Sequence, residues 1–282
     1  MNDGPSAPAD LAEDTALTRP FAGASPYEEY VRASVLSSLQ QPLTEAADEM
    51  GFLVTTQVME LWFTLIVHEW RAAREALVKD DLPAALDALT RSRRALSALN
   101  DSWRPIAALT PLQFEGFRAA FGRASGFQSA MYRHIEFLLG EKSAALVRAH
   151  RGDPAVHEAL GDAHREPSLY DEVLCFLHRQ GLPVPAHVRE RDVTLPHTSD
   201  PAVVELWRGV YAGSPYDPPA VLAEALTDIA ELVARWRFDH LMVVRRAMGA
   251  KPGSGGTAGL AYLEQRARRV VFPELWEARG AL

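Results

Sequence analysis

The sequence predicts an all-α fold. Apolar residues recur at steps of three and four along most of the 282 residues, as on one face of a helix, and the alternation typical of strands is nearly absent. Residues that favour helix starts and helix ends flank these stretches, with threonine or proline before them and glycine after them. With 48% hydrophobic residues, the chain is long enough for a sizeable core, as one large domain or two closely packed ones.

The first part of this fold is predicted to be a helical pair. Five apolar residues fall on one face of a helix, namely Val58, Leu61, Trp62, Leu65 and Ile66. The strongly helix-forming run "EWRAAREALVKDDLPAALDALTRSRRALSAL" follows and contains a proline. The pattern predicts two antiparallel helices with a break near Pro83.

A third helix is predicted to begin after "LTPLQF". Thr110 can cap it, and Pro111 suits its first turn because proline needs no backbone donor there. Phe114, Phe117 and Phe121 would then lie on one face. The sequence therefore predicts a cluster of phenylalanine rings on this helix.

Two shorter helices and one irregular stretch are predicted next. "SAMYRHIEFLLG" reads as a helix that ends at Gly140, and "PSLYDEVLCFLHRQG" as one that ends at Gly181. Residues 182–219 are dense in proline and favour an irregular connection with one helix near "AVVELWRGVY". We interpret residues 1–22 as a disordered leader and residues 23–282 as a single helical domain.

Composition and charge limit the partners and the compartment. The net charge of −8, with basic residues dispersed along the chain, argues against a nucleic-acid partner. The single cysteine, Cys175, cannot form an intrachain disulfide, which suits a reducing compartment. The acidic start lacks the features of a signal peptide, and no stretch stays apolar for the ~20 residues of a membrane span. We expect a cytoplasmic protein with no membrane partner.

One histidine stands out on the last long helix. His240 continues an apolar stripe at alternating steps of four and three, which is formed by Leu222, Leu226, Ile229, Val233, Trp236, His240 and Val243. It is either a core histidine hydrogen-bonded to a neighbour or an axial ligand, since a neutral imidazole in an apolar cavity suits haem iron. The helical pattern does not decide between these two interpretations.

A glycine-rich loop, "GAKPGSGGTAGLAYL", follows this helix. A dinucleotide site would need a strand before the loop, whereas here a helix precedes it. The loop is either a plain connection or a place where the backbone approaches a ligand, with the hydroxyls of Ser254 and Thr257 available.

Several segments together resemble one known family. They are "YEEYV" through "LQQPL", "DEMGFLVTTQVMELWFTLIVHE", "LTPLQFEGFRAAFGRASGFQSAMYRHIEFLLG", and "WRFDHLMVVRRAMGAKPGSGGTAGLAYL" with "FPELW". From about Tyr27 to Leu282 the chain resembles the haem-dependent tryptophan 2,3-dioxygenase family. The resemblance implies an all-helical oxygenase domain over residues 23–282 with haem b, dioxygen as co-substrate and an indole amino acid as substrate. It also implies a homotetramer whose N-terminal segments are exchanged between subunits.

The resemblance assigns roles to individual residues. His240 would be the proximal ligand of the haem iron. Phe52 would pack against the indole ring, and Arg118 would bind the substrate carboxylate, for which a planar guanidinium is well suited. Ser254 stands where the family usually has threonine and would receive the substrate ammonium group. Ser125 would lie in the distal pocket near the bound oxygen.

Two further aromatic residues match the family, and two positions differ from it. Tyr27 and Tyr30 match residues of the exchanged N-terminal segment that close the site over the substrate. Phe114 stands where the family commonly has tyrosine, so one hydroxyl is lost. In "VTTQV", Thr56 stands where the family has the distal histidine that hydrogen-bonds the indole N–H. The pocket would lose an imidazole and gain volume at this position.

The replacement at Thr56 bears on the reaction outcome. A pocket that orients the indole less firmly favours a one-oxygen product, a 2-oxindole or a 3-hydroxylated compound, and the added volume admits a β-methyl group. We therefore expect a monooxygenase of tryptophan or β-methyltryptophan in specialised metabolism, as in antibiotic biosynthesis, with an external reductant. Two alternatives remain: an ordinary dioxygenase that forms N-formylkynurenine, and a non-catalytic protein that binds haem or tryptophan.

Overall fold

The computed structural model describes residues 23–251, 253 and 259–280 of the chain. Within them the secondary structure is helical and includes no β-strand, so the predicted all-α fold is confirmed. The helices are α1 (Pro26–Val31), α2 (Ala33–Ser38), α3 (Ala47–Val78), α4 (Leu82–Asp101), α5 (Pro111–Arg118), α6 (Ala130–Leu138), α7 (Ala144–Ala149), α8 (Pro154–Arg165), α9 (Leu169–Arg179), α10 (Ala186–Arg189), α11 (Pro201–Tyr211), α12 (Pro218–Met248), α13 (Leu260–Ala267) and α14 (Pro273–Arg279). Two 3₁₀ turns are η1 (Ala119–Phe121) and η2 (Gly126–Gln128).

The chain divides into two compact units, residues 1–41 and residues 42–282. In the first unit the side chain of Ser25 caps α1 by accepting a hydrogen bond from the Glu28 N–H, and Arg32, with φ of 55°, separates α1 from α2. Tyr27 and Tyr30 lie on α1, and both are exposed. The predicted leader, residues 1–22, lies outside the described residues.

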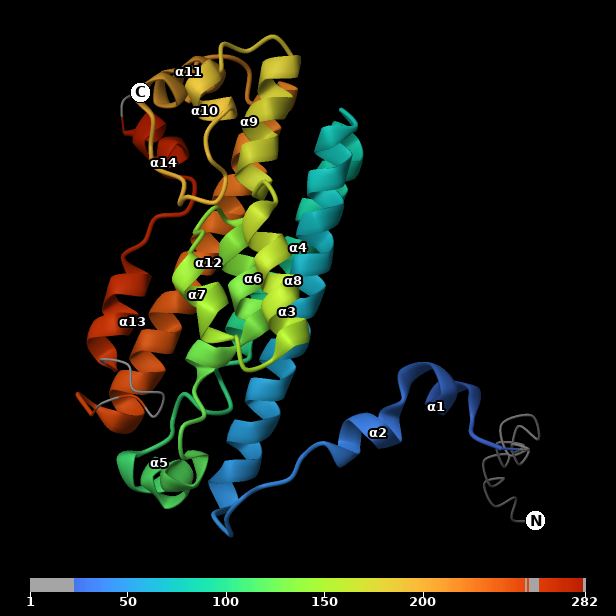
Figure 1. The fold of residues 1–282 in the computed structure, drawn as a ribbon, viewed down its shortest axis with the longest axis vertical. Coiled ribbons are helices and arrows are strands. Elements are labelled where there is room, and N and C mark those ends of the chain that lie inside the picture. Colours follow the sequence, from blue (N-terminus) through green and yellow to red (C-terminus); the bar gives the residue numbers. More distant parts are fainter. Residues whose placement is uncertain (1–22, 252, 254–258, 281–282) are drawn as a thin grey trace, which may run out of the picture. The chain divides into compact units, whose positions relative to one another are not determined.

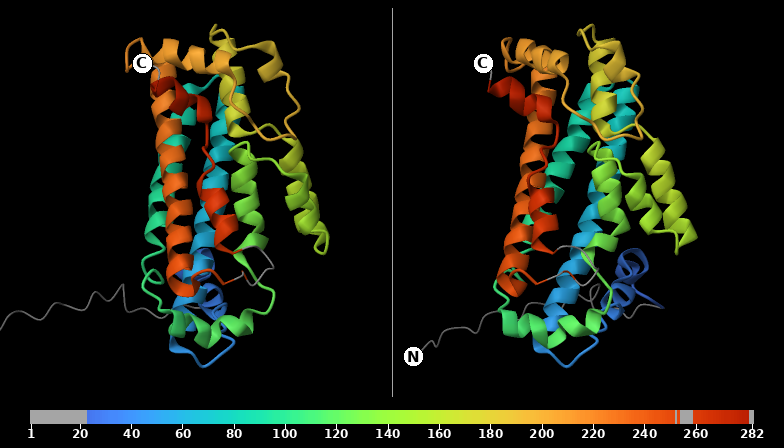
Figure 2. Two further views of the ribbon diagram at one scale, coloured as in Figure 1. Left: turned by 90° about the vertical axis from the view of Figure 1, so that its left-hand side faces the viewer. Right: turned by 60° about the vertical axis from the view of Figure 1, so that its left-hand side comes forward.

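The second unit is built around long helices (Figure 1). In it, α3 packs against α4, α6 and α9, while α12 packs against α4 and α13. Figures 1 and 2 show α5 at one end of this unit and α10, α11 and α14 at the other end. Most buried apolar side chains of these helices form one core cluster.

The predicted helical pair is present as α3 and α4. The Asp81 carboxylate caps α4 by accepting from the Ala84 N–H at 3.0 Å, and Pro83 lies in the first turn. The break near this proline is therefore confirmed. Which face of α3 is buried differs from the expected stripe, because Leu61 is 53% exposed and Leu65 is 39% exposed. The core side of α3 instead carries Thr55, Met59, Phe63, Ile66, Val67, Trp70, Ala73 and Leu77.

An 18-residue window of α3 has a mean hydropathy of 1.5, so by length and composition this helix is apolar enough to cross a membrane. The expectation that no such stretch exists was wrong, because apolar residues occupy both faces of α3 and not only the face toward the core. Ile66 and Trp70 are fully buried against neighbouring helices, whereas only 28% of the apolar window is buried.

The helix starts and ends that were read from capping residues are confirmed. Thr110 and Gln113 form a reciprocal capping box at the start of α5. Gly140 follows α6 with φ of 84°, and Gly181 follows α9 with φ of 87°, a backbone region that glycine adopts without steric cost. The proline-dense connection contains the expected helix as α11, and also the short α10, which was not predicted.

Candidate functional site

Four phenylalanine rings gather where α3 meets α5 and η1. Phe52 of α3 stacks on Phe121 with ring centroids 5.1 Å apart, and it lies 5.6 Å from Phe117 and 6.0 Å from Phe114. The predicted phenylalanine cluster is therefore present. It joins two of the residues assigned to substrate binding, Phe52 and Phe114, on neighbouring helices.

Arg118 is the last residue of α5. Its side chain is 21% exposed and its Nη1 lies 3.5 Å from an oxygen of Glu115, one turn earlier on the same helix. The other partner of Glu115 is Lys251, whose Nζ donates to it at 2.7 Å. Because Lys251 lies at the start of the glycine-rich loop, this pair ties α5 to that loop. Ser254 itself lies outside the described residues.

Thr56 lies one turn after Phe52 on α3 and is half-buried. Its hydroxyl lies 3.0 Å from the Phe52 carbonyl oxygen and 2.8 Å from the Leu53 carbonyl oxygen, and it donates to these backbone groups. The hydroxyl is thus turned back onto its own helix, which leaves the γ-methyl group as the other branch of the side chain.

Ser125 begins the turn η2. Its side-chain oxygen accepts from the Phe127 N–H at 3.3 Å, while the Gln128 side chain accepts from the Ser125 N–H at 3.3 Å. These bonds fix the turn that runs from Ser125 to Ser129. Ser129 in turn caps α6 by accepting from the Tyr132 N–H at 3.0 Å.

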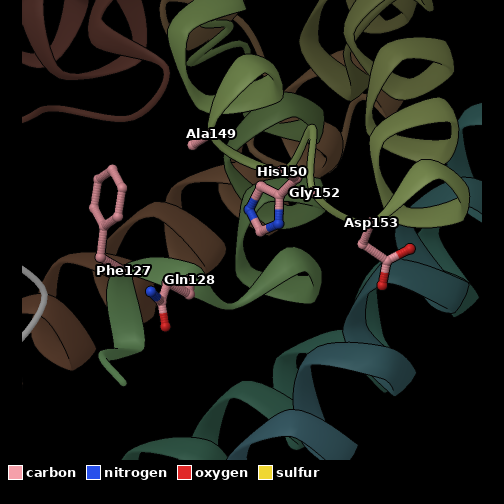
Figure 3. A pocket seen from close by; sticks show the side chains of 6 residues that line it. All are labelled: Phe127, Gln128, Ala149, His150, Gly152 and Asp153. Atoms are coloured by element: carbon pink, nitrogen blue, oxygen red, sulfur yellow. The ribbon is translucent and has the colours of Figure 1, made fainter. Parts of the chain in front are cut away.

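A cavity of about 230 Å³ lies beside this turn (Figure 3). Phe127, Gln128, Ala149, His150, Gly152 and Asp153 line it. A larger hollow of about 840 Å³ lies between α11 and the start of α12, at the other end of the unit. Neither one contains a residue that the sequence analysis assigned to the site.

His240 lies on α12 between two tryptophan rings. Its ring stacks on Trp103 with centroids 5.0 Å apart and an interplanar angle of 21°, and it lies 5.5 Å from Trp236. Burial lowers the pKa of His240 to about 4, so the imidazole is neutral at physiological pH. Within the described part of the chain no group hydrogen-bonds this ring. A neutral imidazole of this kind has a lone pair available for a metal ion.

Two buried donors without partners lie beside this histidine, and others lie on α6 and α12. The indole N–H groups of Trp103 and Trp236 are buried and find no acceptor among the described residues. The same holds for Nε of Arg133 and for Nη2 of Arg237. Since buried donors are normally paired, these atoms indicate a place for a ligand that carries acceptors.

The arginines belong to a buried charged network between α6, α12 and α13. Arg133 pairs with Glu136 at 2.5 Å, and Arg237 pairs with Glu141 at 2.7 Å and donates to the Tyr132 hydroxyl. Arg266 pairs with both glutamates. Three guanidinium groups thus face two carboxylates, and the excess positive charge favours an anionic ligand.

These residues fit the haem that the resemblance implies. A haem offers an iron for a neutral imidazole and two carboxylates for unpaired donors. Sequence analysis singled out His240, and Trp236 lies one turn before it on the same apolar stripe. It missed Trp103 and Arg133, because a tryptophan after a helix end and an arginine inside an apolar helix carry no pattern of their own.

Comparison with known proteins identifies the family. The description of the tryptophan 2,3-dioxygenase family matches residues 12–209 and 197–282. The chain is 40% identical to the tryptophan 2,3-dioxygenase of Bradyrhizobium diazoefficiens over 276 residues, or 98% of each chain. It is 42% identical to that of Saccharopolyspora erythraea over 256 residues, or 90% of this chain and 91% of the relative. The chain therefore belongs to the tryptophan 2,3-dioxygenase family, as the sequence segments predicted.

Proposed function

We propose that this protein is a haem-dependent oxygenase that acts on the indole C2–C3 bond of L-tryptophan or a β-substituted tryptophan. We further propose that it inserts a single oxygen atom and forms a 2-oxindole or a 3-hydroxylated product in specialised metabolism. Family membership and the name of the relatives, tryptophan 2,3-dioxygenase, support the substrate class and the oxygenase chemistry.

The single observation that carries the one-oxygen outcome is the state of Thr56. The family has a histidine at this position, which hydrogen-bonds the indole N–H. Here the side chain is shorter, and its hydroxyl donates to the backbone of its own helix. Thr56 therefore offers the indole neither an imidazole nor a free O–H, and the indole is held less firmly.

The remaining residues would bind and orient the substrate. His240 would hold the haem iron, with the unpaired donors of Trp103 and Arg133 toward the haem carboxylates. A bound haem would supply the iron at which dioxygen is activated. Phe52 would pack on the indole, and Arg118 would exchange its 3.5 Å contact with Glu115 for the substrate carboxylate.

Ser125 and Ser254 would contribute hydroxyl groups. The oxygen of Ser125 already accepts from the Phe127 N–H, and no described residue accepts its own O–H. That O–H would be a donor toward the oxygen side of the pocket. Ser254 would receive the substrate ammonium group. Phe114 adds a ring without a hydroxyl, which makes this side of the pocket more apolar than a tyrosine would.

The two possible outcomes differ in their electron balance. Insertion of one oxygen atom consumes one O₂, two electrons and two protons and releases one water molecule. It therefore needs an external two-electron reductant. Insertion of both oxygen atoms opens the indole ring to N-formylkynurenine and needs no reductant. The name of the relatives favours this second outcome, so dioxygenation is the second candidate function.

The decisive experiment measures product mass under oxygen-18 gas, with and without reductant. Wild-type protein should add one labelled atom to tryptophan or β-methyltryptophan, and only when a reductant is present. Thr56→His should shift the product toward two labelled atoms and reduce use of the β-methyl substrate, because the imidazole restores a hydrogen bond and fills the added space.

Thr64→His is the matched control. Thr64 lies on the same helix and also donates its hydroxyl backwards, to the Glu60 carbonyl oxygen at 2.9 Å, but it is exposed. This variant should give the wild-type product. Two labelled atoms in a ring-opened product of wild-type protein would replace the monooxygenase proposal by the dioxygenase. Haem binding with no product from either substrate would indicate the non-catalytic binding protein.

We also propose a homotetramer in which the N-terminal segment of each subunit closes a neighbouring site. Tyr27 is 66% exposed and Tyr30 is 90% exposed on α1, so both rings are available to a partner. The apolar side chains that α3 exposes, Met50, Val54, Leu61 and Leu65, support burial against another subunit. The mass of the protein in solution, measured by light scattering, tests this assembly.

A further inference from the structure

One carboxylate oxygen of α5 lies between two cations. Oε1 of Glu115 is 2.7 Å from Nζ of Lys251 and 3.5 Å from Nη1 of Arg118. Lys251 donates a hydrogen bond to this oxygen, whereas the contact with the arginine is longer than an ordinary hydrogen bond. The two cations therefore share the oxygen unequally, and Lys251 has the closer contact.

Two helix ends bring these cations to Glu115. Glu115 and Arg118 are three residues apart on α5, so they lie on the same side of it. Lys251 follows α12, which packs against α5. Gly249 ends α12 with φ of 57°, a conformation that favours glycine, and the Lys251 N–H donates to the Met248 carbonyl oxygen at 3.3 Å. The end of α12 thus sets the backbone from which the Lys251 side chain reaches α5.

The charge of Glu115 is compensated in the same order. The pKa of Glu115 lies below that of an ordinary glutamate, chiefly because Lys251 donates a hydrogen bond to it, and Arg118 has a smaller effect. Glu115 is therefore ionised at neutral pH. In the sequence of α5, PLQFEGFR, it is the acidic residue, so it is the carboxylate that the helix itself presents to Arg118.

A carboxylate one turn from Arg118 competes with a substrate that carries a carboxylate of its own. A guanidinium group forms its strongest contacts as two parallel hydrogen bonds to one carboxylate. If Glu115 had no other cation, it could close on Arg118, and the substrate would have to break that pair before binding. Lys251 reduces this cost because it already holds the Glu115 oxygen.

We propose that Lys251 is a positioning residue for substrate binding: it holds the Glu115 carboxylate in its own hydrogen bond and so weakens the competition of Glu115 with the substrate carboxylate for Arg118. Lys251 touches neither the substrate nor the haem in this assignment, because it acts through Glu115. The effect on substrate binding rests on the proposed function. The effect of Lys251 on the pair formed by Glu115 and Arg118 does not.

The test removes the two charges singly and together in the full-length, haem-loaded protein. The variants are Lys251→Met, Glu115→Gln and the double variant, and Lys251→Arg keeps a cation that can donate to Glu115. The matched control is Arg245→Met, because Arg245 of α12 pairs with Glu264 of α13 at 2.6 Å. The side chains of that pair are 48% and 41% exposed, nearly the same as the 50% and 41% of Lys251 and Glu115.

The first measurement is the affinity for L-tryptophan, with indole as the compound that lacks the carboxylate. Lys251→Met should weaken tryptophan binding about threefold to fivefold, the size of one exposed ion pair, and should leave indole binding unchanged. Glu115→Gln should bind tryptophan at least as tightly as wild type, and the double variant should match wild type, because the competing charge is gone. Lys251→Arg and Arg245→Met should also match wild type.

The second measurement needs no substrate. A double-mutant cycle of Glu115→Gln and Arg118→Ala on denaturant unfolding gives the coupling between these two residues. The cycle is measured once with Lys251 present and once in Lys251→Met. The coupling should be larger in Lys251→Met, because Arg118 is then the partner left to Glu115 among the ion pairs of the described residues.

The positioning role is overturned if Lys251→Met binds tryptophan like wild type, or if it loses the same affinity with and without Glu115→Gln. In the latter case Lys251 would act by its own charge. The same loss in Arg245→Met, or an unchanged coupling between Glu115 and Arg118 in Lys251→Met, also overturns it. If wild-type protein binds no tryptophan but the coupling rises in Lys251→Met, the effect of Lys251 on the pair stands and the proposed function fails.

Discussion

Buried tryptophans in two regions of the molecule differ in how their N–H groups are used. Trp207 of α11 donates to the Tyr170 hydroxyl at 2.9 Å, at the end of the unit where α10 and α14 also lie. Trp103 and Trp236, beside His240, are also buried, but their N–H groups find no acceptor in the described part of the chain. The same aromatic residue is therefore satisfied by protein in one region and unsatisfied in the other.

This difference separates a structural region from a ligand site. Around Trp207 the indole N–H has its acceptor and Nε2 of His197 pairs with Glu274 at 2.7 Å, although Nδ1 of His197 and Oε2 of Glu274 have no partner among the described residues. Around His240 the buried donors point to acceptors that the protein does not supply. Unpaired donors are costly in a packed interior, so a bound group that satisfies them should stabilise this region in particular.

The largest expected effect tests the His240 side of the comparison. His240→Ala should give folded protein with little haem or a changed Soret band, because α12 contains no second histidine to replace it. His187→Ala, at an exposed histidine that pairs with Asp200, is the control and should keep the haem spectrum. A native spectrum in His240→Ala would remove the basis for calling this region a ligand site.

A charged pair extends the comparison to Arg118. Arg191, in the structural region, holds Asp171 through two contacts of 2.8 Å and 3.1 Å, whereas Arg118 meets Glu115 at 3.5 Å. Truncation of a desolvated charge partner costs ~2–5 kcal/mol. Arg118→Ala should therefore reduce the use of tryptophan by at least about tenfold.

Indole, which lacks the carboxylate, is the control substrate. Its use should hardly change in Arg118→Ala. The nearby exposed Arg123 provides a control variant, since Arg123→Ala should leave the use of both compounds unchanged. Equal losses for tryptophan and indole in Arg118→Ala would mean that Arg118 supports the fold.

The smallest expected effect is the difference in stability and haem binding between variants of Trp207 and Trp103. Trp207→Phe removes a hydrogen bond within the protein and should lower the free energy of unfolding of the haem-free protein by about 1 kcal/mol beyond the loss of packing. Trp103→Phe removes a donor that has no described partner, so it should cost less stability but weaken haem binding. Denaturant unfolding and haem titration of both variants measure these effects, and equal behaviour would contradict the comparison.

Local signals in the sequence were enough to predict where helices begin and end. The Thr110 cap, the break near Pro83 and the glycines after α6 and α9 depend on neighbouring residues alone, and all are present. Phe114 and Phe117 lie on α5 as their spacing predicted, whereas Phe121 lies in η1 and Phe52 joins the cluster from α3. For the cap, the break and the glycines, the determining interaction lies within a few residues of chain.

Features that depend on distant packing were not predicted. Leu61 and Ile66 are both apolar, and only the position of α4, α6 and α9 decides that the first is exposed and the second buried. Trp103 reaches His240 across 137 positions of sequence, and the buried Arg133 pairs with Glu136, which also pairs with Arg266 of α13. Sequence periodicity contains no information on such contacts between helices.

A threonine and a histidine at position 56 of α3 differ in the hydrogen-bond partners that they need. A threonine inside a helix can satisfy its hydroxyl on the preceding turn, as the contacts of 3.0 Å and 2.8 Å to Phe52 and Leu53 do here. A threonine at this position therefore leaves no polar group of its own unpaired. A histidine placed there must find partners for two ring nitrogens among residues adapted to its absence. A histidine at position 56 would therefore need partners that the threonine does not need.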